Sequence, residues 1–160
     1  LKKDNYDIIY DDDYSGEIAD VVTLKLHPDK LSVGLYHLKF AIDGKVTEQV
    51  KNLYEVCGQA QKSVHWKHKE GTEFINHLLR RETKNRNGQT CSRLEVGSSD
   101  DLKKLLSIAK KEIPMEYEIY IVQPGFSKAT ATNEILTLLG VTENYLKEVA
   151  GINLKVIANQ

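Results

Sequence analysis

Alternating apolar and polar positions in the first forty residues predict three β-strands. Residues 6–10 form a short β-rich run that ends in the acidic turn 11–16, and residues 17–26 form the next extended segment. These two segments should pair as a hairpin. A turn over residues 27–30 precedes a third segment, 31–40, with apolar residues on both faces, as is typical of a central strand.

The strand period of two assigns a face to each polar residue in these segments. It puts Asp20 on the same face as Val22, and it turns Glu17 to the opposite face. In the third segment His37 and Lys39 share one face. The pattern therefore predicts that Asp20, His37 and Lys39 meet where the two strands end.

The remaining sequence alternates between helical spacing and one more pair of strand-like segments. A meander followed by β-α-β pieces predicts an α/β fold, with a mixed central sheet flanked by helices. We expect helices over about 46–65, 71–82, 98–112 and 132–150. Residues 83–90 are expected to form a polar loop with a turn at Asn87-Gly88. Two further strands are expected, over 116–123, where Pro124-Gly125 ends the strand, and over 152–158, after Gly151.

Composition indicates one globular domain spanning residues 1–160. The chain is 41% hydrophobic and 28% charged, which excludes disordered and collagen-like classes, and no apolar run is long enough to span a bilayer. We therefore expect no membrane association. Cys57 and Cys91 form no CxxC pair and no secretory leader is visible, which favours a reducing, cytoplasmic location. Because the chain opens at Leu1, close to a strand, we interpret it as part of a longer protein.

Charge is unevenly distributed although the net charge is only -1. Residues 1–20 carry seven acids, and residues 61–93 carry eight Lys or Arg against three Glu. An acidic cluster near a basic stretch suits metal ions beside a phosphate backbone. The alternative is that both runs are solvated faces of a neutral protein.

Hydrolysis of a phosphodiester at neutral pH requires a hard divalent cation, an activated water molecule and a positive group near the developing charge. A carboxylate on one strand and a lysine on its neighbour meet these needs. Asp20 and the run His37-Leu38-Lys39 have this layout.

Three runs resemble the PD-(D/E)xK restriction-endonuclease-like superfamily, and more narrowly the nuclease domains attached to helicase-type proteins of bacterial defence systems. They are residues 16–20 (GEIAD), 35–39 (LYHLK) and 54–63 (YEVCGQAQKS). The resemblance implies that Asp20, the Leu38 carbonyl and His37 hold Mg²⁺ or Mn²⁺. It also implies that Lys39 activates water and Gln59 orients it. The expected activity is endonucleolytic cleavage of DNA, in an antiviral or restriction system.

His37 stands where this superfamily has Asp or Glu, and imidazole is a poor ligand for Mg²⁺. Three interpretations stay open. His37 binds a softer ion such as Mn²⁺, Glu17 or Glu55 supplies the carboxylate, or the site is inactive. Because Glu55 lies one helical turn from Gln59, it is preferred to Glu17. A further alternative is a structural Asp20–Lys39 ion pair.

The expected partners are DNA, double-stranded, and a helicase or ATPase domain in the same chain or complex. The alternative function is a catalytically inactive DNA-binding or docking module of a helicase, or a domain that only connects a motor to its partners. The residues expected to contact the DNA backbone are Lys62, Arg80, Arg81, Lys84, Arg86, Ser127 and Lys128.

Overall fold

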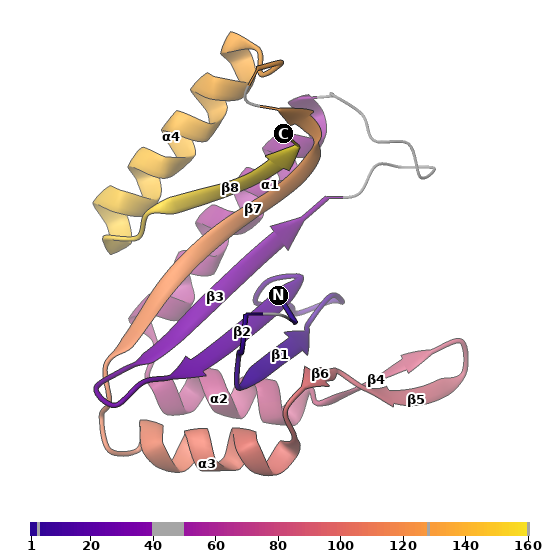
Figure 1. Cartoon of the computed structure of the whole chain (residues 1–160), viewed down its shortest axis with the longest axis vertical. Helices are drawn as coiled ribbons and strands as arrows, with labels where there is room; N and C mark the ends of the chain where they lie inside the picture. The colour runs from indigo at the N-terminus through magenta and orange to yellow at the C-terminus, as the bar shows by residue number, and fades with distance from the viewer. Residues whose placement is uncertain (3, 40–49, 128, 160) are drawn as a thin grey trace.

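A mixed β-sheet forms the centre of the molecule in the computed structural model, which describes residues 1–2, 4–39, 50–127 and 129–159 (Figure 1). Within these residues the sheet has six strands in the order β6-β1-β2-β3-β7-β8. This confirms the prediction of an α/β fold with a mixed sheet. The strands are β1 (Ile8–Asp11), β2 (Val21–Leu26), β3 (Leu31–Leu38), β6 (Leu94–Val96), β7 (Met115–Ser127) and β8 (Leu154–Asn159).

The first three strands form the predicted antiparallel meander. Leu24 of β2 pairs with Ile8 on one side and Val33 on the other, and all three side chains are buried. β7 then joins β3 in parallel, and β8 joins β7 in parallel. The apolar alternation sets this register, because a slip by one residue would turn the buried side chains toward solvent.

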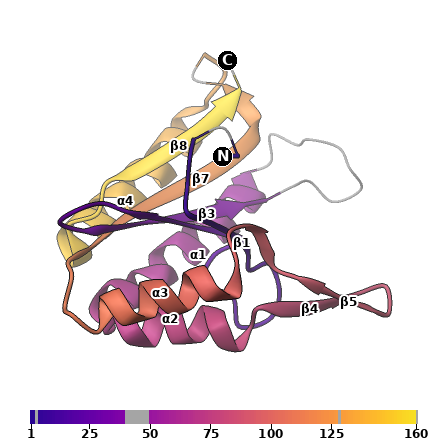
Figure 2. The same cartoon turned by 60° about the horizontal axis from the view of Figure 1, so that its bottom comes forward.

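The described helices cover one side of the sheet, as Figures 1 and 2 show. Leu53, Val56 and Cys57 of α1 are buried in the core that this packing forms. On the other side of the sheet the rings of Tyr36 and Tyr120 stack at 4.2 Å. The helices are α1 (Val50–Ser63), the 3₁₀ helix η2 (Val64–His68), α2 (Gly71–Arg80), α3 (Ser99–Ala109) and α4 (Asn133–Ala150).

Two helix ends follow the expected capping chemistry. The Ser98 hydroxyl accepts a hydrogen bond from the Asp101 N–H, which completes a capping box at the start of α3. Gly151 ends α4 in the left-handed conformation, with φ 65°. The predicted start of the first helix, residues 46–49, and Phe40 of the predicted third strand lie outside the described residues.

Four segments differ from the sequence prediction, and the first is β6, a strand of the central sheet that was not predicted. The extended conformation of the second strand starts only at Val21, not at residue 17. Residues 83–90 are not a polar loop, because β4 (Thr83–Arg86) and β5 (Gln89–Ser92) form a hairpin that projects from the body (Figure 1). β7 continues past Pro124 to Ser127. Its pairing with β8 shifts register between Gln123 and Ser127, and such a bulge tolerates a proline, which has no N–H.

No helix among the described residues has the length and apolar character needed to cross a membrane. The thiols of Cys57 and Cys91 are both free.

Candidate metal centre

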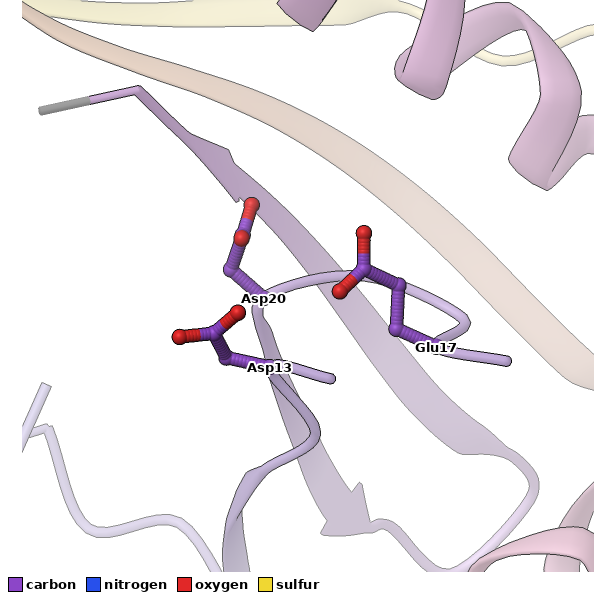
Figure 3. A group of neighbouring side chains, drawn as sticks. All are labelled: Asp13, Glu17 and Asp20. Carbon is purple, nitrogen blue, oxygen red and sulfur yellow. The ribbon is translucent and has the colours of Figure 1, made fainter. Parts of the chain in front are cut away.

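The loop between β1 and β2 brings three carboxylates together. Asp13, Glu17 and Asp20 each offer an oxygen within 4.8 Å of the others. Figure 3 shows these side chains around a common space. Asp13 is exposed, whereas Glu17 and Asp20 are partly buried. We call these three residues the acidic cluster.

A buried ion pair fixes the backbone of this loop. The fully buried Asp12 accepts a hydrogen bond from the Ile18 N–H at 2.7 Å and another from Arg81 Nε at 3.0 Å. Arg81 also donates to the Ser15 carbonyl at 2.8 Å. Gly16 lies between these anchors with φ 83°, in the left-handed region that glycine adopts without strain. The loop is therefore held at both ends of its turn.

Asp20 joins the loop to the end of β3. Its Oδ2 accepts a hydrogen bond from the Leu38 N–H at 2.7 Å. Lys39 follows directly, and its ammonium donates to Glu55 Oε1 on α1 at 2.7 Å. The alternative of a structural Asp20–Lys39 ion pair is wrong, because Lys39 forms its ion pair with Glu55. Lys39 still acts on Asp20 as a nearby positive charge.

Electrostatics at the cluster favour the arrival of a cation. Burial raises the pKa of Glu17, and the negative charges of Asp20 and Asp13 raise it further. Burial also raises the pKa of Asp20, against the hydrogen bond from the Leu38 N–H, which lowers it. A divalent cation would lower both the free-energy cost of burying these negative charges and the repulsion between them.

Gln59 on α1 completes the arrangement. Its Nε2 donates to Glu17 Oε1 at 3.3 Å, while its Oε1 is buried and has no hydrogen-bond partner among the described residues. A buried acceptor without a partner is costly unless a ligand or water satisfies it. Carboxylate oxygens are ligands that Mg²⁺ and Mn²⁺ prefer, so the acidic cluster fits a hard divalent cation.

His37 lies elsewhere. Its side chain is buried under α1, with Nε2 3.1 Å from Ser63 Oγ. Burial lowers its pKa to about 4, so the imidazole is neutral at pH 7. The structure thus gives His37 a packing partner in the core and leaves it outside the acidic cluster, although it lies on the strand face predicted for it.

Glu17, and not Glu55, is the carboxylate that joins Asp20. Strand alternation predicts that Glu17 faces away from Asp20. This prediction is wrong because β2 starts only at Val21, so residue 17 does not follow the strand alternation. Glu55 is engaged by Lys39 instead. Asp13 was missed as a candidate ligand. The signal for it was the acidic run 11–13 directly before the Gly16 turn.

The basic residues expected to contact DNA divide into two groups. Arg81 and Lys84 pair with Asp12 and Asp11, and these contacts hold the hairpin and the acidic loop to the body. Arg86 lies 3.7 Å from Asp11, but its side chain remains 67% exposed, so it can reach a partner. Arg93, outside the expected set, is buried and donates to the Asp11 carbonyl.

Other members of the expected set have fewer internal contacts. Lys62 and Arg80 are exposed. The Ser127 N–H donates to Thr130 Oγ1 at 3.0 Å, in a turn after β7. Lys128 lies outside the described residues.

A small pocket adjoins the acidic cluster. It has a volume of about 110 Å³, and Glu17 and Gln59 form the wall that it shares with the cluster. The remaining lining comes from Ile18 and from the end of α1 with η2, namely Lys62, Ser63, His65 and Trp66.

Comparisons with protein-family models, with curated proteins and with solved structures gave no match to this chain.

Proposed function

We propose that this chain hydrolyses phosphodiester bonds in DNA with the help of a divalent metal ion, Mg²⁺ or Mn²⁺. The observation that carries the proposal is the convergence of Asp13, Glu17 and Asp20 beside Gln59, with Lys39 at the adjoining strand end. Oxygen ligands and one lysine are the groups that metal-assisted phosphodiester cleavage requires.

Each residue would have a separate task. Glu17 and Asp20 would hold the cation, with Asp13 as a third, exposed ligand. When bound, the cation supplies Lewis acidity toward a phosphoryl oxygen. Lys39 would stabilise negative charge that develops on the phosphate, after its ammonium turns from Glu55 toward the substrate. Gln59 would orient a water molecule with its unpartnered Oε1.

The order of elements supports a restriction-endonuclease-like core as part of this proposal. An antiparallel meander is followed by α1 against it and by a strand parallel to β3. The candidate residues lie on the β1–β2 loop, the end of β3 and α1. The proposal includes double-stranded DNA as substrate and a helicase-type ATPase as partner, in the same chain or complex, within the cytoplasm of a cell that uses the domain for antiviral defence or restriction.

Cleavage of plasmid DNA in Mg²⁺, Mn²⁺ or EDTA tests the proposal. We expect nicking or linearisation with metal and none in EDTA. Asp20→Asn keeps an oxygen for the Leu38 N–H but lacks the charge, and we expect it to lower the rate of DNA cleavage at least ~100-fold. We expect the same decrease in Lys39→Ala. Asp29→Asn, in the exposed β2–β3 turn, serves as the matched control. Unchanged cleavage in Asp20→Asn or Lys39→Ala would contradict the assignment.

One observation favours a second function. His37 fills the second motif position, and an imidazole supplies no negative charge there; its ring is buried and neutral, with Nε2 3.1 Å from Ser63 Oγ. The chain would then be a catalytically inactive DNA-binding or docking module. This alternative predicts salt-sensitive DNA binding without cleavage in any metal.

A further inference from the structure

The pocket beside the acidic cluster differs from the cluster in chemistry. Glu17 and Gln59 form the wall toward the cluster, and the rest of the lining is Ile18, Lys62, Ser63, His65 and Trp66. It therefore offers an apolar ring, a cation and an imidazole a short way from the carboxylates. A ligand that reaches from the cluster into this pocket must combine an anionic group with a flat or apolar group.

The volume of the pocket limits the ligand to one ring. An enclosed cavity of roughly 150 Å³ holds a benzene molecule. The pocket has about 110 Å³ and is partly open to solvent, so a pyrimidine ring or a deoxyribose can enter it and a base pair cannot.

Lys62 is placed to receive the anionic group. It lies on α1 seven residues after Glu55 and three after Gln59, so the three side chains follow the same side of the helix. Lys62 is exposed, and no hydrogen bond or ion pair engages its ammonium among the described residues. A phosphate between Lys62 and a cation at the acidic cluster would be attracted from both sides.

Trp66 is held in position before any ligand binds. Its indole makes an edge contact with the Phe74 ring at 5.7 Å and a tilted contact with His77 at 4.8 Å. An aromatic side chain that is already ordered loses little entropy on binding a base, and base–aromatic contacts tolerate every sequence.

We propose that this pocket holds the base or the sugar of one unpaired nucleotide, next to the phosphodiester that the acidic cluster would bind. The nucleotide places its phosphate on Lys62 and its ring or sugar against Trp66. This inference rests on the proposed function and sharpens it, because the strand must be single-stranded or locally opened where it enters the site. A helicase-type partner would supply such a strand.

Trp66 is the only tryptophan of the chain, so tryptophan fluorescence reports on this residue of the pocket lining. In Ca²⁺ we expect thymidine 5′-monophosphate to quench this fluorescence saturably, and thymidine without phosphate to bind at least ~10-fold more weakly. Lys62→Ala should weaken the monophosphate at least ~10-fold. Lys67→Ala is the matched control, because Lys67 lies on η2 outside this pocket and contacts the Met115 carbonyl. No quenching, or equal affinity in Lys62→Ala, would overturn the proposal.

Cleavage assays separate a failure of the pocket from a failure of the proposed function. If the pocket acts as proposed, single-stranded or gapped DNA is cut faster than blunt duplex, and Lys62→Ala removes the preference. Lys62-dependent quenching without cleavage in any metal refutes the nuclease and keeps the nucleotide pocket. Cleavage without quenching keeps the nuclease and refutes the pocket.

Discussion

At the scale of single residues, Asp12 shows how a buried charge can serve a neighbouring site. Its carboxylate is fully buried, and burial raises its pKa, while the Ile18 N–H and Arg81 lower it. A buried carboxylate without partners costs several kcal/mol. The Arg81 contacts thus stabilise the charged form and, through the same atoms, hold the loop that carries Glu17 and Asp20.

Removing Arg81 should therefore destabilise the protein strongly. Arg81→Ala removes the guanidinium hydrogen-bonded to Asp12 and leaves only Arg93, whose Nη1 lies 3.9 Å from Asp12 Oδ1, so we expect the free energy of unfolding to fall by about 3 kcal/mol. Urea denaturation at pH 7 measures this. Arg80→Ala removes the exposed neighbouring arginine, the last residue of α2, and should change stability by less than ~0.5 kcal/mol. Equal effects of the two substitutions would show that the ion pair does not stabilise the loop.

His37 makes stability depend on pH. Its pKa is about 4 in the folded state against 6.5 without burial, so only the unfolded chain gains the proton between these values. The stability that the protein gains from a neutral, buried His37 is fully present above pH 6.5. The free energy of unfolding then falls by on the order of 3 kcal/mol as pH drops toward 4.

Urea denaturation at pH 7 and pH 4 in parallel with His37→Gln isolates this effect from the titration of the acids. The variant should lose less stability than the parent protein over this range. A parallel decrease in both proteins would contradict a buried neutral imidazole.

At the scale of elements, alanine substitutions at two glycines, Gly140 and Gly97, should change stability in opposite directions. Gly140 lies inside α4, and a Cβ added there meets no atom within 4 Å, so Gly140→Ala should stabilise the protein by about 0.5–1 kcal/mol. Gly97 joins β6 to α3 with φ 85°, and a Cβ there would lie 2.6 Å from the Asp7 carbonyl oxygen. Gly97→Ala should destabilise by about 1–3 kcal/mol. Thermal unfolding of both variants checks the pair, and shifts of the same sign would contradict it.

Element boundaries separate what patterns predict from what they miss. The capping box at Ser98 and the glycine after α4 were visible because the signals are local. The β4–β5 hairpin was missed since its strands are polar on both faces and bury no apolar side chain, which leaves no alternation to detect. Only the turn at Asn87-Gly88, with φ 52° and 80°, was evident.

At the scale of the whole molecule, metal binding and folding should be coupled. The acidic cluster gathers carboxylates from a loop that is assembled only in the folded chain, so a bound cation stabilises the fold by mass action. At a concentration of Mn²⁺ 100 times its Kd, the gain is about 2.7 kcal/mol. We expect Mn²⁺ to raise the melting temperature of the parent protein and of Asp29→Asn. Asp20→Asn should respond far less, and an equal rise in Asp20→Asn would place the ion elsewhere.

The sequence by itself determined the meander, the helix that follows it, and the placing of Asp20 and Lys39 at adjoining strand ends, because these depend on short periodic patterns. Only the tertiary structure decided which further carboxylates join Asp20. Glu17 turns inward since Asp12 and Arg81, 69 residues apart, fix the backbone of its loop. Long-range ion pairs with Asp12 and Asp11 likewise engage Arg81 and Lys84, so these two side chains are not free cations. No local pattern encodes such pairings, since they form only when distant segments pack together.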